Sequence, residues 1–329
     1  MNVYFDKDNL RSFVKSASRS AFQDCSRMLK NQLDIKFTFP KKDLAQENEI
    51  KEWIKTMNTG VNGNINWEVS PPKRPLTADS ICEFNKSQLS SVYLLDDNFE
   101  DEIASNGLVV YGGVGSEVDI LYSLIMKDTD YSFMKQIPIC NLKNWKDLEK
   151  YLSPCTDIII HHKYIFSSED VNKPNIYSLI ETLCTKAKNA IINIFVFTLP
   201  QIIIKTEDKT IKTSPNWEDI RKNIKRIVSN VTGKEPNVTF VLSSKLEHDR
   251  QIFTNYKYIK SGDTLNYFDS SWNIITDGSQ IELFSLANKE FYKNGFDFVA
   301  RENEVYNKVC EKNSSNVIGE EICNYFKKK

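Results

Sequence analysis

The sequence predicts an α/β fold, and three observations support this class. Strand-like apolar runs alternate along the chain with segments whose apolar residues recur every three or four positions, as in amphipathic helices. Residues 191–199 form a continuous apolar run, which is typical of a strand covered on both faces. The alternation itself favours a mainly parallel sheet whose strands are joined by helices.

The first 140 residues predict an α/β region whose topology the sequence leaves unassigned. Strand patterns occupy residues 1–6, 91–97 and 108–113, and helix patterns occupy residues 10–29, 44–57 and 117–126. The first of these helices is expected to be one long element that begins near Asp8. Residues 71–75, with the sequence PPKRP, predict a loop or linker because proline interrupts both helices and strands.

Residues 141–329 are predicted to form a second domain in which the alternation is clearer. Strand patterns occupy residues 157–166, 191–199, 238–243 and 251–255, followed by a hairpin over residues 274–286 that turns at residues 277–278. Helix patterns occupy residues 145–152, 175–190 and 217–231, and the charged tail over residues 298–329 is expected to be helical.

Composition limits the classes of partner and the compartment. The 43 basic and 44 acidic residues nearly cancel, so any phosphate ligand must be held by a local patch and not by a global positive field. The seven cysteines are scattered without a Cys-x-x-Cys pair, which argues against a disulfide framework or a zinc cluster. No basic and apolar leader and no membrane-length apolar run are visible, so we expect a cytoplasmic protein without a membrane span, a metal or a cofactor.

All three histidines of the chain fall in two short His-x-basic patches, each next to a strand-like run. The patches are His161-His162-Lys163 and His248-Asp249-Arg250. Side chains at positions i and i+2 of a strand point to the same face. His248 and Arg250 should therefore face one site, while Asp249 faces elsewhere. In the same way, His161 and Lys163 should share one face, and His162 should lie on the opposite face.

The spacing after the second patch extends the pattern. Arg250 is followed after four residues by Asn255, and Asn255 after six residues by Gly262. A glycine in this turn would let backbone N–H groups approach an anion closely. After the first patch, the equivalent positions hold Ser168 and Asn175.

These patches resemble the duplicated His-x-Lys half-sites of the phospholipase-D-like superfamily, in which the patch is followed by Asp and then Gly at the same spacing. Residues 140–290 resemble more specifically the C-terminal phospholipase-D-like domain of MIT-domain proteins, where a strand ending in Asp-Pro-Tyr precedes a helix, a strand and a His-Asp-Arg sequence. In that alignment His162 and Lys163 take the places of Asp and Pro. The resemblance implies a phospholipase-D-like sandwich in the C-terminal half.

The resemblance implies recognition of a phosphodiester or another phosphate-bearing ligand by a degenerate site, with nucleic acid as the first expected ligand and a bacterial defence system as one setting. The candidate residues of this site, some of which could also be catalytic, are His161, His162, Lys163, His248, Arg250, Asn255 and Gly262. Lys163, Arg250 and Gly262 are the expected phosphate contacts.

Two other interpretations of the patches remain open. An active metal-free phosphodiesterase would use His161 or His162 as one catalytic imidazole and His248 as the other. Ser168 and Asn255 stand where the family has the carboxylate that orients each histidine, which weakens this alternative. In a structural or partner-binding protein the histidines would be ordinary hydrogen-bonded residues, and the C-terminal helices would contact a protein partner.

Three further signals favour simpler interpretations. Several acids lie at the ends of strand patterns or at the start of the next helix, namely Asp6, Asp96-Asp97, Glu117 and Asp119. Acids in such places can hold Mg²⁺, as in PIN-like nucleases. Roles in turns and at the start of a helix explain them more simply. The Gly-rich segment 112–116 could seat a phosphate, although Ser116 as a helix N-cap also accounts for it. The basic residues of helix 217–231 are expected to form its solvated face.

Overall fold

The computed structural model describes residues 1–59, 65–67, 89–95, 110–126, 131–205, 210–276 and 279–326. Within them the chain divides into two compact units. Unit 1 comprises residues 1–133 with 285–293, and unit 2 comprises residues 134–284 with 294–329. The predicted loop at residues 71–75, Asp96-Asp97 and the hairpin turn at residues 277–278 lie outside the described residues.

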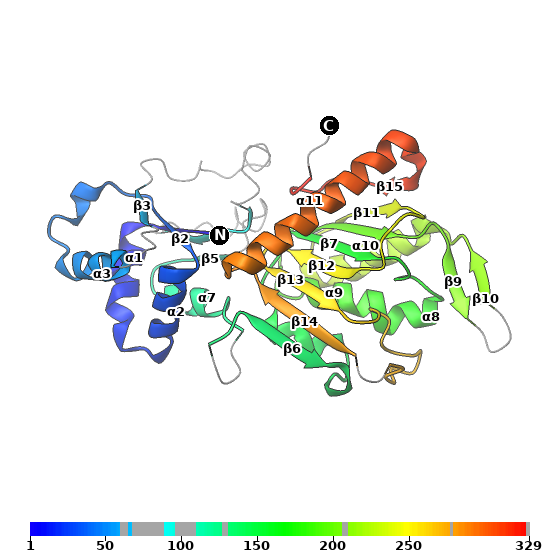
Figure 1. Ribbon diagram of the computed structural model, residues 1–329, viewed down its shortest axis with the longest axis horizontal. Helices are drawn as coiled ribbons and strands as arrows, with labels where there is room; N and C mark the ends of the chain where they lie inside the picture. The colour runs from blue at the N-terminus through cyan, green and yellow to red at the C-terminus, as the bar shows by residue number, and fades with distance from the viewer. Residues whose placement is uncertain are drawn as a thin grey trace. The chain divides into compact units, whose positions relative to one another are not determined.

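Unit 1 contains a sheet whose described strands are all parallel, in the order β3-β2-β1-β4-β5. Figure 1 shows the strands of this sheet in blue to cyan. The strands are β1 (Asn2–Phe5), β2 (Asp34–Phe37), β3 (Ile65–Trp67), β4 (Val92–Leu94) and β5 (Val110–Gly112). The helices are α1 (Lys7–Lys15), η1 (Ser16–Ser18), α2 (Ser20–Asn31), η2 (Lys41–Leu44), α3 (Asn48–Asn58) and α7 (Glu117–Tyr122).

Aromatic packing holds the helices of unit 1 on its sheet. Phe13 on α1 lies 5.9 Å from Phe5 on β1, 4.9 Å from Phe22 on α2 and 5.8 Å from Trp53 on α3, measured between ring centroids. Each of these side chains has at most 8% of its surface exposed. Burial of apolar and aromatic surface from three helices and one strand is therefore the main source of stability in this unit.

The prediction of one helix over residues 10–29 is wrong, because the helix stops after α1 and restarts as α2. Between the two helices Arg19 has an extended backbone, with φ −72° and ψ 135°. The break falls in the segment Ser16–Ser20, where hydroxyl groups compete for backbone hydrogen bonds. Ser16 illustrates this competition, since its Oγ donates to the Ser12 carbonyl oxygen at 3.0 Å.

Unit 2 is built on a mixed sheet whose described strands follow the order β15-β11-β8-β7-β12-β13-β14-β6. The strands are β6 (Met134–Pro138), β7 (Asp157–His162), β8 (Asn193–Thr198), β11 (Asn237–Leu242), β12 (Arg250–Thr254), β13 (Lys257–Ser261), β14 (Gln280–Ser285) and β15 (Val317–Gly319). Strands β11, β8 and β7 are parallel, and β12 is antiparallel to β7. A separate hairpin consists of β9 (Ile202–Lys205) and β10 (Thr210–Thr213).

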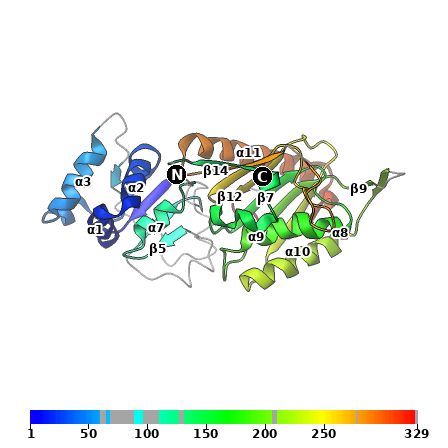
Figure 2. The same cartoon turned by 90° about the horizontal axis from the view of Figure 1, so that it is seen from below.

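Helices cover both faces of this sheet, as Figure 2 shows, with α9 and α10 on one face and α11 on the other. The helices are η3 (Ile139–Asn141), η4 (Trp145–Tyr151), α8 (Glu169–Asn172), η5 (Lys173–Tyr177), α9 (Ser178–Cys184), α10 (Trp217–Thr232), η6 (Ser314–Asn316) and α11 (Lys289–Lys312), of which residues 289–293 are assigned to unit 1. Strands β7 and β8 are buried along their whole length, which explains why their central residues, 158–160 and 194–197, are continuously apolar and do not alternate.

Two expectations for the second domain need correction. The α-helix of the tail ends at Lys312, and after the short η6 the residues Val317–Gly319 form edge strand β15, antiparallel to β11. The expected boundary at residue 140 falls after β6, whereas the compact units divide at residue 133. Residues 134–138 belong with unit 2 because β6 pairs with β14 along its length.

Candidate functional site

The two His-x-basic patches meet at one end of the unit 2 sheet. Strand β7 ends at His162 and strand β12 begins at Arg250. The two strands are antiparallel neighbours, with His162 opposite Arg250 and His161 opposite Gln251. Side chains directly opposite each other in such a pair have Cβ atoms about 4.5–5.5 Å apart, so the pairing brings an imidazole and a guanidinium together.

The strand alternation separates the two adjacent histidines. His162, Arg250 and, on β13, Ser261 occupy equivalent positions and share one face of the sheet. His161 belongs to the opposite face, which is covered by α11. Lys163 lies in the turn just after β7. The five predicted residues of the patches therefore do not all surround one cleft.

His161 is engaged by partners at both ring nitrogens. Its Nδ1 lies 2.9 Å from Glu302 Oε2 on α11, and its Nε2 lies 3.3 Å from the Glu247 carbonyl oxygen. Burial disfavours the charged ring, but the hydrogen bond and the charge of Glu302 outweigh burial and raise the pKa of His161. Because both ring nitrogens already have partners, His161 joins the sheet to α11 and has no nitrogen left for a ligand.

An ionic network on the same face holds the start of the second patch. Arg301 lies 2.9 Å from Asp249 Oδ2, 3.4 Å from Glu302 Oε1 and 3.6 Å from Glu247 Oε2. Asp249 therefore faces α11, away from Arg250, as the alternation predicted. This arrangement keeps the Asp249 carboxylate off the face that carries Arg250.

His162 is a buried neutral ring. It is 3% exposed, and its Nδ1 has no hydrogen-bond partner among the described residues. Burial, reinforced by the charges of Arg250 and His161, lowers the pKa of His162 to about 3. The ring therefore stays uncharged near neutral pH and cannot serve there as the imidazolium acid of a phosphohistidine mechanism.

Arg250 carries an uncompensated positive charge beside this ring. One guanidinium nitrogen, Nη1, donates to the Gly262 carbonyl oxygen at 3.2 Å, while its buried Nε has no partner among the residues that the structure describes. Within that part of the chain no carboxylate lies within 4.0 Å of the guanidinium. An arginine that is partly buried without a counterion is suited to bind an anion.

Lys163 and His248 lie around the exposed ring of Tyr164. The Lys163 ammonium is 5.8 Å from the centroid of the Tyr164 ring, and the centroid of the His248 ring is 5.9 Å from it. His248 is exposed, in contrast to the two buried histidines. The Tyr164 ring therefore has one residue from each patch next to it.

The structure places Asn255 at the other end of strand β12 from Arg250. Five residues of strand correspond to about 17 Å. Asn255 Oδ1 accepts hydrogen bonds from the backbone N–H groups of Thr156, at 2.9 Å, and Asp157, at 3.1 Å. Asn255 thus stabilises the start of β7, and the spacing match that singled it out does not bring it to Arg250.

Gly262 contacts Arg250, but the contact is made by its carbonyl oxygen and not by its N–H group. Its N–H donates to the Gln280 carbonyl oxygen at 3.3 Å, within the sheet. The expected role of this N–H in holding an anion therefore has no support in the structure. No local sequence pattern signals Glu302, which orients His161 from 141 positions away along the chain.

The Gly-rich segment of unit 1 is organised by Glu117. Glu117 is fully buried and accepts hydrogen bonds from Asn9 Nδ2 at 3.2 Å, Ser12 Oγ at 3.0 Å and the Gly115 N–H at 2.9 Å. Gly115 adopts φ +99°, a conformation that favours glycine. Ser116 occupies the N-cap position of α7, as predicted, but its hydroxyl donates to the Gly113 carbonyl oxygen at 2.7 Å and makes no capping hydrogen bond to the helix.

The basic face of α10 is largely paired with acids. Arg221 lies 2.5 Å from both Glu218 and Glu320, and Lys225 contacts Glu235 and Glu320. Lys222 is 4.0 Å from Asp219. These contacts agree with a solvated helix face and give no reason to place a ligand there.

No protein-family model, curated protein or solved structure matches the chain. Among the described residues no helix is both long enough and apolar enough to cross a membrane. The same residues contain no cluster of three or more His, Cys, Asp or Glu side chains that could hold a metal ion.

Proposed function

We propose that unit 2 recognises a phosphate-bearing ligand, with nucleic acid as the first candidate, through His162, Arg250 and Lys163. The observation that carries this proposal is the pair of buried nitrogen atoms, His162 Nδ1 and Arg250 Nε, that lack partners on one face of the sheet. A buried polar group without a hydrogen bond costs about 1–3 kcal/mol. A phosphate oxygen would remove this cost and neutralise the guanidinium.

Recognition fits this geometry better than metal-free hydrolysis does. Attack by one imidazole and protonation of the leaving group by another require two histidines that face one cleft. His161 is bonded on the α11 face, and His162 is buried and uncharged. A phosphodiesterase that uses His248 with His161 or His162 is therefore the weaker alternative, and cleavage in the presence of a chelator that disappears in His248→Ala would support it.

We further propose that unit 2 is a degenerate phospholipase-D-like domain. Two features support this proposal. The patches that resemble the superfamily's half-sites lie at the tips of adjacent central strands, and helices cover both faces of the sheet.

Arg250→Gln is expected to weaken binding of a short single-stranded oligonucleotide by about 10- to 100-fold, because a hydrogen bond to a charged group contributes about 1.5–3 kcal/mol. Fluorescence anisotropy at two salt concentrations measures the change. Arg226→Gln, which removes an exposed arginine on α10, is the matched control and should leave affinity nearly unchanged. Equal affinities for wild type and Arg250→Gln would exclude the site.

A second candidate function is metal-dependent phosphodiester hydrolysis by unit 1, and the strand order favours it. In an open parallel sheet of order 3-2-1-4-5, ligands bind beyond the carboxyl ends of the strands where the order reverses, between β1 and β4. Asp6 follows β1 at this point, and the Thr38 hydroxyl donates to its carboxylate. Mg²⁺ is commonly held by one or two carboxylates together with substrate phosphates, so Asp6 is a suitable ligand.

Asp6→Asn is expected to reduce Mg²⁺-dependent cleavage of single-stranded nucleic acid at least about 100-fold, because removing a group that acts on the developing charge usually has an effect of this size. Gel analysis of products with Mg²⁺ and with chelator measures the effect. Asp8→Asn changes an exposed acid two residues away and should retain activity. Wild-type protein that yields no products with Mg²⁺ would exclude this second function.

A further inference from the structure

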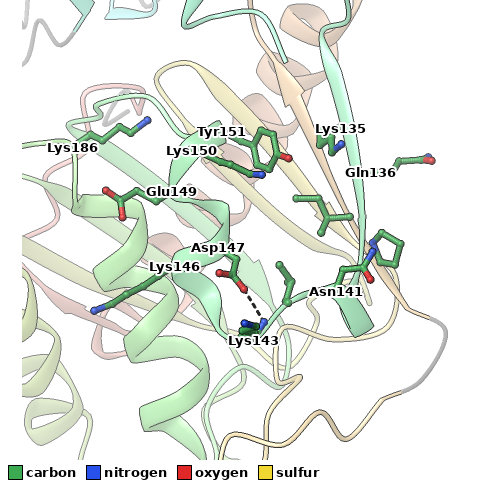
Figure 3. Close-up of a pocket in the computed structure, with 13 residues that line it drawn as sticks. Lys135, Gln136, Asn141, Lys143, Lys146, Asp147, Glu149, Lys150, Tyr151 and Lys186 are labelled. Atoms are coloured by element: carbon green, nitrogen blue, oxygen red, sulfur yellow. Dashed lines mark hydrogen bonds between the residues drawn. The ribbon is translucent and has the colours of Figure 1, made fainter. Parts of the chain in front are cut away.

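A groove rich in lysine lies on unit 2, away from the patches. It has a volume of about 780 Å³ and is bordered by β6, the segment after η3, η4 and Lys186. Figure 3 shows its side chains. We call it the lysine groove, defined by Lys135, Lys143, Lys146, Lys150 and Lys186. Its volume lies in the range of small-molecule sites, which span about 300–1,000 Å³.

The groove carries an excess of positive charge. Its lining contains five lysines but only two acids, Asp147 and Glu149. Asp147 Oδ2 accepts the Lys143 backbone N–H at 2.7 Å, the contact drawn as a dashed line in Figure 3. Among the described residues no carboxylate lies within 4.0 Å of the ammonium groups of Lys143, Lys150 and Lys186. A concentration of unmatched ammonium groups attracts multiply charged anions.

Tyr151 positions part of this charge. The ammonium groups of Lys150 and Lys135 lie 4.8 Å and 5.7 Å from the centroid of its ring. Cation–π attraction at such distances holds the lysines near the ring. Because the ring is already in contact with cations, it is better suited to orient lysines towards phosphates than to stack on a base.

A buried lysine near Lys186 is an independent indication of an anion. Lys257 on β13 has no exposed surface, and its Nζ has no hydrogen-bond partner among the residues that the structure describes. Burial, followed by the charge of Lys186, lowers the pKa of Lys257 to about 7. Lys186 itself donates to the Leu152 carbonyl oxygen at 2.7 Å, and burial lowers its pKa although the charge of Glu149 opposes this. An anion bound beside Lys186 would stabilise the charged form of both amines.

We infer that the lysine groove binds a chain of closely spaced phosphate groups, as found in a free oligophosphate or in the backbone of single-stranded nucleic acid. The lysines come from β6, η4 and the segments beside them, so they can contact successive phosphates and not a single one. This groove is a site separate from Arg250, and binding to it does not require the function proposed above.

The test compares two double variants with the same loss of charge. Lys143→Gln with Lys150→Gln removes two groove lysines, and Lys173→Gln with Lys222→Gln removes two exposed lysines elsewhere on unit 2. Isothermal titration with tripolyphosphate and fluorescence anisotropy with a single-stranded oligonucleotide measure binding, and circular dichroism confirms folding. For the oligonucleotide, the slope of log affinity against log salt should fall by about 1.4 in the groove variant, since each phosphate contact contributes roughly 0.7.

Loss of binding in the groove variant alone supports the inference, and the probe that binds identifies the source of the phosphates. Equal losses in both double variants, or no binding of either probe by the wild type, would overturn it. Arg250→Gln distinguishes the two sites. Tripolyphosphate binding that persists in Arg250→Gln and disappears in the groove variant supports the groove, whatever happens at Arg250.

Discussion

Lys257→Met is expected to raise the free energy of unfolding at pH 7 by roughly 3–5 kcal/mol, because a lysine pKa lowered by more than three units corresponds to a penalty of this order. Lys257 has no exposed surface, and its amine has no described partner that would compensate for burial. Methionine keeps most of the length and flexibility of the side chain without the amine. Urea denaturation measures the gain, and Lys222→Met on the exposed face of α10 should change stability by no more than about 0.5 kcal/mol.

The free energy of unfolding should also depend on pH in a direction that the pKa of Lys257 determines. The pKa of Lys257 is about 7 in the folded protein, against about 10.4 for an unperturbed lysine. Between these values the unfolded chain binds more protons than the folded protein, so this residue makes the wild-type free energy of unfolding rise from pH 7 to pH 10. The rise should be smaller in Lys257→Met. An unchanged stability together with an unchanged slope would show that the amine is charged and compensated.

Glu302→Ala is expected to destabilise the protein by about 3–5 kcal/mol, the usual cost of removing one partner from a buried ion pair. The substitution leaves His161 Nδ1 without a partner in a site that is almost completely buried. It also removes one of the three carboxylates around Arg301. Replacing both partners, with His161→Leu and Glu302→Leu, should cost less than Glu302→Ala alone, because no buried charge then remains uncompensated.

Glu302→Gln separates the charge from the hydrogen bond through its pH dependence. The pKa of His161 is raised in the folded protein, so its charged pair with Glu302 contributes fully below the ordinary histidine pKa of about 6.5. This contribution is lost as the pH rises through the raised value. The deficit of Glu302→Gln relative to wild type should therefore be larger at pH 6 than at pH 9 in urea denaturation. Equal deficits would mean that His161 is neutral throughout.

Local patterns predicted much of the secondary structure, because apolar periodicity reflects burial directly. The continuous apolar run 191–199 predicts β8, and the apolar stripe of Ile220, Ile224, Ile227 and Val228 predicts α10. The long helix predicted over residues 10–29 failed where serines interrupt it. Periodicity records which face is apolar, but it does not record a competing hydrogen bond.

The candidate site was predictable only in part. The sequence located both patches at strand tips, and the alternation separated Asp249 from Arg250. It could not decide which histidine would share a face with Arg250, since that depends on the register between β7 and β12. The spacing of four residues between Arg250 and Asn255 suggested that both belong to one site. In the folded protein this spacing is the length of strand β12, and Asn255 lies at its far end.

By itself the sequence determined the α/β class, the buried strands and the positions of the basic patches, since these follow from side chains close to one another along the chain. The tertiary structure alone decided the strand order of both sheets, the pairing of His161 with Glu302, the placement of Arg250 opposite His162 and the assembly of the lysine groove. Each of these depends on residues far apart in sequence, whose contacts arise from the packing of whole elements and leave no local pattern.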